Sequence, residues 1–186
     1  MRRVVAFCAA HGIEVGAHPS YVDREGFGRR SLVVAPPVVE AQVFEQCVAL
    51  AVIARDHRVP VAFVKPHGAL YHDAARDAAL AGAVIDGAIR ALGPVAVLGP
   101  SWGTPALQLV AEARGVAYWR EGFADRASRA DGSLVPRSEP GALIADPAVA
   151  AARARALAGT VDAICIHGDS PNALAIAGAV RSALTR

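Results

Sequence analysis

We predict an α/β protein built around a parallel β-sheet, and three features of the 186-residue sequence lead to this prediction. Short, almost continuously apolar runs alternate with longer Ala-rich runs. The short runs lack the polar alternation of a strand with one face in water, so they fit strands covered on both faces. Gly, Pro and capping residues separate the runs. This alternation favours parallel strands with right-handed helical crossovers, either as an open doubly wound sheet or as an incomplete barrel.

Five strands and six helices are expected. The strands are residues 13–17, 61–64, 95–98, 116–119 and 163–166. A first, core-facing helix precedes them, since Met1-Arg2-Arg3 and the apolar run behind it resemble a secretory signal only faintly. The other helices are residues 38–56, 77–92, 105–114, 147–157 and 171–184. Thr104, Asp146 and Ser170 each precede a proline, which predicts an N-cap followed by proline at the first helical position. The longest loop, residues 121–145, is expected to be functional because long loops in compact domains usually are.

Length, charge and cysteine content exclude several classes of protein. The length predicts a single domain over residues 1–186. The net charge is +2 and the basic residues form no cluster, so we expect neither a nucleic-acid partner nor a membrane surface. No strictly apolar stretch is longer than residues 48–54, which are too short to span a bilayer. Three cysteines lie in apolar runs without CxxC spacing, which predicts reduced thiols in a cytoplasmic protein.

Titratable side chains follow four of the five predicted strands. His18 follows the first strand, and Lys65 and His67 follow the second. Glu121 and Asp125 follow the fourth strand, and His167 and Asp169 follow the fifth. In parallel α/β folds, functional sites form at the carboxyl ends of the strands. One such histidine is more often structural, but three in matching positions indicate a catalytic site.

Several other residues are candidates for binding an anion. Arg29 and Arg30 can hold a carboxylate or phosphate through paired N–H groups, or can belong to a solvated loop. Ser170 lies at a predicted helix start, where free backbone N–H groups favour an anion and where its hydroxyl can also act as an ordinary cap. Lys65, the only lysine, ends an apolar strand and therefore needs a charged partner or ligand. Arg137 is either loop surface or a cation of the site.

No familiar nucleotide or hydrolase motif is present. The sequence contains neither a Walker A motif nor a GxGxxG after a strand, and it has neither HExxH nor GxSxG. A nucleotide would therefore bind here without the usual glycine-rich cradle.

Four stretches resemble one family closely. They are GAHPSYVDREGFGRR (16–30), VKPHGALYH (64–72), EGFADRASRADGSLVPRSEPGALIAD (121–146) and ICIHGDSPNAL (164–174). Their content and order resemble the LamB/YcsF family, the A subunits of prokaryotic 5-oxoprolinase. The resemblance implies a parallel (β/α) barrel of the glycoside hydrolase/deacetylase type. The family's opening DLNxDLGE-like and ACGxHAGD-like motifs are not found, so the barrel is expected to be incomplete, lacking its first strands.

The resemblance also implies an activity. The family hydrolyses the lactam of 5-oxo-L-proline to L-glutamate with ATP, together with B and C subunits. ATP makes chemical sense, because an unstrained amide is a poor electrophile. The candidates for proton transfer are His18, His67, His167, Asp125 and Asp169. The candidates for binding substrate or phosphate are Lys65, Arg29, Arg30, Glu121, Arg137 and Ser170.

Two alternatives remain open. Three histidines and several carboxylates on one face could hold a divalent metal, as in a metal-dependent amide hydrolase or deacetylase, although no local ligand spacing supports this. The shortened start also allows a non-catalytic partner of the other subunits. In a homo-oligomer, contacts between copies could cover the open barrel edge. Metal content after purification without chelator separates the first alternative from the others.

Overall fold

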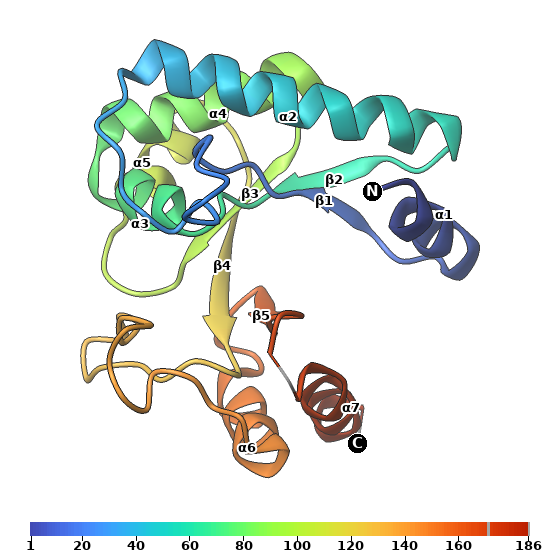
Figure 1. Cartoon of the computed structure of the whole chain (residues 1–186), viewed down its shortest axis with the longest axis vertical. Coiled ribbons are helices and arrows are strands. Elements are labelled where there is room, and N and C mark those ends of the chain that lie inside the picture. The colour runs from blue at the N-terminus through green and yellow to red at the C-terminus, as the bar shows by residue number, and fades with distance from the viewer. Residues whose placement is uncertain (171, 186) are drawn as a thin grey trace. The chain divides into compact units, whose positions relative to one another are not determined.

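A computed structural model describes residues 1–170 and 172–185 (Figure 1). It contains five strands: β1 (Val15–Ala17), β2 (Val61–Val64), β3 (Ala96–Pro100), β4 (Tyr118–Phe123) and β5 (Ala163–Cys165). The strands follow one another in the sheet in chain order, and β1–β2, β2–β3 and β4–β5 pair in parallel. A doubly wound sheet reverses its strand order at a switch point, whereas a (β/α) barrel adds each strand beside the last. The structure therefore confirms the α/β prediction and favours the barrel type over the open sheet.

The chain divides into two compact units. Unit 1 comprises residues 1–99 and 104–118, and unit 2 comprises residues 100–103 and the chain from Trp119 onward. The expectation of a single domain over residues 1–186 stays a prediction.

Unit 1 contains five helices and the larger hydrophobic core. The helices are α1 (Arg2–His11), α2 (Pro36–Asp56), α3 (Ala69–Arg76), α4 (Ala78–Leu92) and α5 (Ala106–Ala113). The α2 helix lies along α4 (Figure 1) and buries the predicted stripe of Val43, Cys47 and Leu50. A Cβ on Gly87 of α4 would lie 2.5 Å from the carbonyl oxygen of Glu40. Glycine at this position therefore allows the two helices to approach closely.

Helix α2 is also long and apolar enough to cross a membrane, by length and composition alone. One such helix is weak evidence, because the core helix of a globular domain has the same composition. In unit 1 its apolar stripe is buried at Val39, Val43 and Cys47, which are at most 1% exposed. The structure thus gives this apolar stripe a packing role within unit 1.

Unit 2 packs α6 (Pro147–Leu157) and α7 (Ala173–Leu184) around β4 and β5. Its small core contains Ala150, Ala154, Ile176 and Val180. The loop between β4 and α6 is organised by Arg126, which is 5% exposed and donates to the carbonyl oxygens of Ala142 (3.3 Å) and Val135 (2.6 Å). A charged side chain that is buried needs such partners, so Arg126 fixes the shape of this loop from within.

The predicted elements differ from the observed ones mainly at their ends. Helix α3 was not predicted, since residues 69–76 are short and follow the His67-Gly68 turn directly. The fourth strand lies later than residues 116–119 and includes Glu121, which is therefore a buried strand residue rather than part of the loop. The other ends shift by at most two residues, and the fifth strand starts at Ala163 as predicted but ends one residue early, at Cys165.

Of the three predicted caps, one is confirmed. The Asp146 carboxylate accepts from the backbone N–H groups of Ala148 and Val149. The Thr104 prediction is wrong: the N-cap of α5 is Pro105, with no side-chain hydrogen bond. The third predicted cap is also displaced, because α7 has Asn172 as its N-cap, and Pro171 lies outside the described residues.

The burial of the cysteines leads to a first prediction. Cys8 and Cys47 are buried, and Cys165 is partly exposed. Burial raises the pKa of the Cys47 thiol to about 11, and the thiolate is the reactive form. We expect a thiol reagent at about pH 8 to modify no more than one cysteine in the folded chain and all three after denaturation. Modification of Cys47 in the native protein, seen by mass spectrometry, would contradict this packing.

Candidate functional site

Two histidines meet at the carboxyl ends of β1 and β2. His18 directly follows β1, and His67 follows β2 after Lys65 and Pro66. The Nδ1 of His67 lies 3.0 Å from the Nε2 of His18. The other ring nitrogens contact backbone carbonyl oxygens, His18 Nδ1 that of Lys65 (2.7 Å) and His67 Nε2 that of Phe27 (2.9 Å). The structure thus brings together two of the three predicted strand-end histidines as one hydrogen-bonded couple.

The loop after β1 covers this couple and is held by its own polar contacts. The Asp23 carboxylate accepts from the Nε of Arg30 (3.0 Å), from its terminal NH2 group and from the backbone N–H of Gly26. Arg30 is one of the two arginines predicted to bind an anion, and here it forms an ion pair within the loop. Arg29, the other, lies with its guanidinium 5.0 Å from the centre of the Phe27 ring.

A second set of contacts ties the loop to α3. The buried Tyr21 hydroxyl and the Ser31 hydroxyl both donate to the Asp73 carboxylate, each at 3.0 Å. Burial, followed by the hydrogen bond to Asp73, raises the pKa of Tyr21 well above its ordinary value. The phenol therefore remains a neutral donor, and it anchors the loop over the couple.

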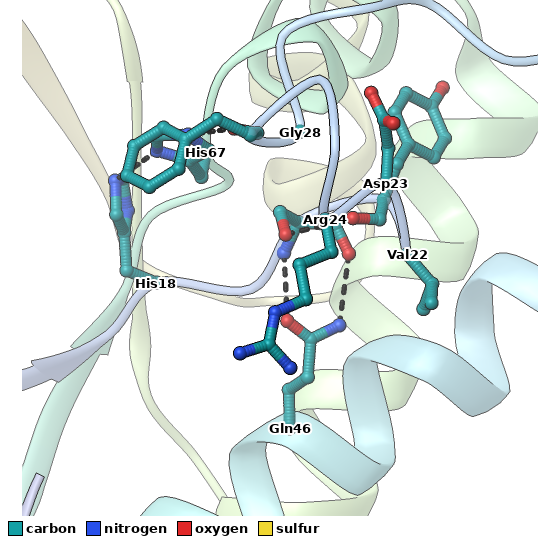
Figure 2. A pocket seen from close by; sticks show the side chains of 10 residues that line it. His18, Val22, Asp23, Arg24, Gly28, Gln46 and His67 are labelled. Atoms are coloured by element: carbon teal, nitrogen blue, oxygen red, sulfur yellow. Dashed lines mark hydrogen bonds between the residues drawn. The ribbon is translucent and has the colours of Figure 1, made fainter.

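The loop and α2 line an open cavity of about 480 Å³ (Figure 2). His18 and His67 lie on one side of the view, and Gln46 reaches up from α2 to hold the backbone N–H and carbonyl of Ser20 (Figure 2). Arg24, Val22 and Phe27 also line the cavity. A cavity of this size suits a small molecule, and its two histidines are those predicted from the strand ends.

The Asp23–Arg30 pair leads to a second prediction. The hydrogen bond from Arg30 is the main cause that lowers the pKa of Asp23 to about 2. Because the pKa of Asp23 is lowered in the folded state, the pair stabilises the loop at pH values above the ordinary pKa of aspartate. This stabilisation is lost as the pH falls toward 2. We expect hydrogen exchange in residues 21–31 to speed up selectively over that range. In Asp23→Asn the exchange should already be fast near neutral pH, and an unchanged exchange rate in that variant would contradict the role of the pair.

In unit 2, Asp125 orients His167. The Asp125 carboxylate, 4% exposed, accepts from the backbone N–H of His167 (2.6 Å) and contacts its Nδ1 at 2.9 and 3.1 Å. Burial by itself raises the pKa of Asp125, but these hydrogen bonds from His167 outweigh it and hold the pKa below its usual value. An ionised carboxylate on Nδ1 fixes the tautomer in which Nδ1 carries the proton and Nε2 can act as a base.

Aromatic rings pack beside this pair. The Phe123 ring is stacked near the His167 ring, with centroids 5.9 Å apart, and Trp102 lies 6.2 Å from Phe123. Apolar walls limit the positions that the imidazole can take. Asp125 and His167 together have the geometry of a general base held by a carboxylate.

The remaining predicted residues occupy more varied places. In unit 2, Arg137 and Asp169 form a loose ion pair at 4.0 Å, and Glu121 is 2% exposed within β4. The Oγ of Ser170 is buried and has no hydrogen-bond partner among the described residues, and it does not cap α7. In unit 1, the Lys65 ammonium lies 5.9 Å from the centre of the Tyr71 ring. The predicted roles of these residues stay predictions.

A metal site finds no support in the part of the chain that the structure describes. No group of three His, Cys, Asp or Glu side chains there is close enough to hold an ion. The metal-dependent alternative stays a prediction that metal analysis can test.

Sequence reasoning missed Arg24, Phe27 and Gln46 as parts of the cavity, and Phe123 beside His167. One of them carried a signal in the sequence. Phe27 lies between Gly26 and Gly28, where a large apolar residue in a charged loop is unexpected, and Phe27 itself has a positive φ of 54°. Gln46 lies one position before the buried Cys47, and a sequence pattern cannot show that its amide binds a loop.

The chain is thus a parallel α/β protein of the barrel type, with oriented histidines at its strand ends, which is the class of a hydrolase-like (β/α) domain. The LamB/YcsF family model matches residues 1–186, and the chain belongs to this family. The chain is 42% identical to the 5-oxoprolinase A subunit of Symbiobacterium thermophilum over 99% of its own length and 75% of that protein. It is 44% identical to the same subunit of Streptomyces coelicolor, over 99% and 78%. A crystal structure of a lactam utilization protein from Thermus thermophilus superposes with a TM-score of 0.87 at 35% identity, covering 99% of this chain and 78% of that one.

Proposed function

We propose that this chain is the A subunit of a 5-oxoprolinase and acts in the hydrolysis of the lactam of 5-oxo-L-proline to L-glutamate. The names of its relatives support the substrate class. The Asp125–His167 pair is the single observation that carries the chemistry, because it supplies a base of fixed tautomer.

His167 is assigned the role of general base. Its Nε2 takes a proton from a water molecule as the water oxygen adds to the lactam carbonyl carbon. The C–N bond then breaks, and the ring nitrogen takes up the proton from the His167 imidazolium to become the amino group of glutamate. Asp125 stays ionised and stabilises the imidazolium that forms.

ATP and two partner subunits complete the proposal. When bound, ATP would supply a phosphoryl group to the lactam oxygen, and this group would leave as inorganic phosphate when the carbonyl is restored. Lys65, Arg29 and Arg137 are each cationic and remain separate candidates for contacting its phosphates. Partners of the B and C type are proposed because the relatives carry the name of an A subunit.

The experiment that tests this function measures ATP-dependent glutamate release from 5-oxoproline. The chain is mixed with candidate B and C subunits, beside a version extended upstream with DLNxDLGE-like and ACGxHAGD-like motifs. Glutamate release that depends on ATP and on the chain supports the function. No release from either version, with both folded and bound to their partners, would overturn it.

A further inference from the structure

The hydrogen bonds of His18 and His67 determine where two of their protons lie. His18 Nδ1 contacts the carbonyl oxygen of Lys65 at 2.7 Å, and His67 Nε2 contacts that of Phe27 at 2.9 Å. A carbonyl oxygen only accepts, so both of these nitrogens must carry a proton and donate it. Each ring is thereby fixed in one tautomer.

The two remaining nitrogens face each other at 3.0 Å. A neutral imidazole has one N–H group, and each ring already uses that group to donate a hydrogen bond to a carbonyl oxygen. Two neutral rings would therefore direct two lone pairs at each other at hydrogen-bond distance, which is repulsive. One further proton turns this contact into an N–H···N hydrogen bond.

We propose that the His18–His67 couple holds one proton more than two neutral imidazoles, and that the resulting positive charge makes the adjoining cavity a binding site for a small carboxylate. The cavity of about 480 Å³ is lined by both rings and by Arg24, a second cation. Phe27, packed edge-on to His67 with centroids 5.4 Å apart, adds an apolar wall beside the charge. This combination suits a carboxylate joined to a small apolar body.

The charged surroundings of the couple within unit 1 are mixed. The loop after β1 carries Asp23, Arg24, Glu25, Arg29 and Arg30, Lys65 follows β2, and α3 carries His72 and Asp73. Of these carboxylates, Asp23 accepts hydrogen bonds from Arg30, and Asp73 accepts them from Tyr21 and Ser31. These bonds direct the carboxylates toward their own donors, so the positive charge of the couple and of Arg24 can act on a ligand in the cavity.

The proton count is measured on the chain itself, by NMR of its 15N-labelled histidines. At about pH 7, we expect the four ring nitrogens of the couple to share three protons, with a titration that is common to both rings. His67→Gln and His18→Gln assign the signals. Two neutral rings at this pH, each with one unprotonated nitrogen, would overturn the proposal.

Binding is measured by titrating acetate, a probe that carries only the carboxylate. We expect the affinity to fall at least about tenfold from pH 6 to pH 9, because the couple loses its extra proton as the pH rises. His67→Gln keeps a donor for the Phe27 carbonyl but carries no charge, and Arg24→Gln removes the second cation, so both should bind acetate at least about tenfold more weakly. His11→Gln, at an exposed histidine of α1, is the matched control and should bind like the parent chain.

Thermal melting shows whether both variants are folded. If they are, equal acetate affinity in His67→Gln and in the control would overturn the proposed binding site. The natural ligand of the site is assigned as the carboxylate of 5-oxoproline, and this assignment rests on the proposed function. It is tested by competition: 5-oxoproline should displace acetate, and 2-pyrrolidinone, the same lactam without the carboxylate, should not. Acetate binding that 5-oxoproline fails to displace would support the charged couple and count against 5-oxoproline as its ligand.

Discussion

Replacing Asp125 with asparagine should lower the turnover of the assembled enzyme by about 10²- to 10⁴-fold, the usual range when a general base loses its orienting carboxylate. The asparagine fills the same space, but its amide is neutral and its NH2 group donates. It can hold His167 in the other tautomer, with Nε2 protonated and unable to accept a proton from water. The contacts at issue are those of the Asp125 oxygens with Nδ1, at 2.9 and 3.1 Å.

The measurement is kcat and KM for 5-oxoproline, with the pH profile of each variant. A loss confined to kcat, together with a changed pH profile, is the signature of a base that is present in the wrong state. The matched control is Asp162→Asn in the same unit, because Asp162 also accepts from a backbone N–H and from an arginine, Arg120, but is exposed. Parent-like turnover in Asp125→Asn would contradict the role given to His167.

The same carboxylate has a consequence for stability. The pKa of Asp125 is lowered in the folded state, so its interactions stabilise the chain at pH values above the ordinary pKa of aspartate. This stabilisation is lost as the pH falls through the pKa of the folded state. The difference in the free energy of unfolding between the parent chain and Asp125→Asn should therefore shrink as the pH falls below about 4. A difference that does not change with pH would mean that packing, and not charge, dominates at this position.

How far the sequence predicts the fold depends on which forces act locally. The apolar runs of β2 and the stripe of α2 were predictable because burial on both faces, or on one stripe, leaves a direct trace in the order of residues. The Asp146 cap was predictable because a capping side chain acts within three residues of itself. Helix α3 was not, because it is short and its stability comes from packing in the core at Leu70 and Ala74.

The candidate site shows a similar limit. Strand-end positions pointed to His18, His67 and His167, but only the folded chain shows that two of them bond to each other and that the third is held by Asp125. Arg30 looked like a ligand-binding group because arginine is suited to carboxylates, and its carboxylate within the structure is that of Asp23. Partner choice among nearby charges depends on loop geometry, which periodicity and spacing do not encode.

Glycine at position 68 leads to the second prediction of large effect. Gly68 is the single residue between His67 and the start of α3. Its φ of 58° and ψ of −125° form a conformation that is open essentially to glycine alone. A Cβ there would lie 2.4 Å from the carbonyl oxygen of Gly28. That oxygen accepts from the backbone N–H of Ala69 at 2.9 Å, so it cannot move away without breaking the contact between the loop and α3.

We therefore expect Gly68→Ala to lower the free energy of unfolding by about 3 kcal/mol or more, since backbone strain of about 1–3 kcal/mol adds to a clash with backbone. The control is Gly12→Ala, which has a similar φ of 63° but no atom within 4 Å of the added Cβ, and should cost only about 1 kcal/mol. Chemical denaturation of both variants gives the comparison. Because the strained turn also positions His67, Gly68→Ala should weaken acetate binding while it is still folded. Equal losses of stability in the two variants would show that φ alone matters, and that the approach of Gly28 to Gly68 does not hold the loop over the histidine couple.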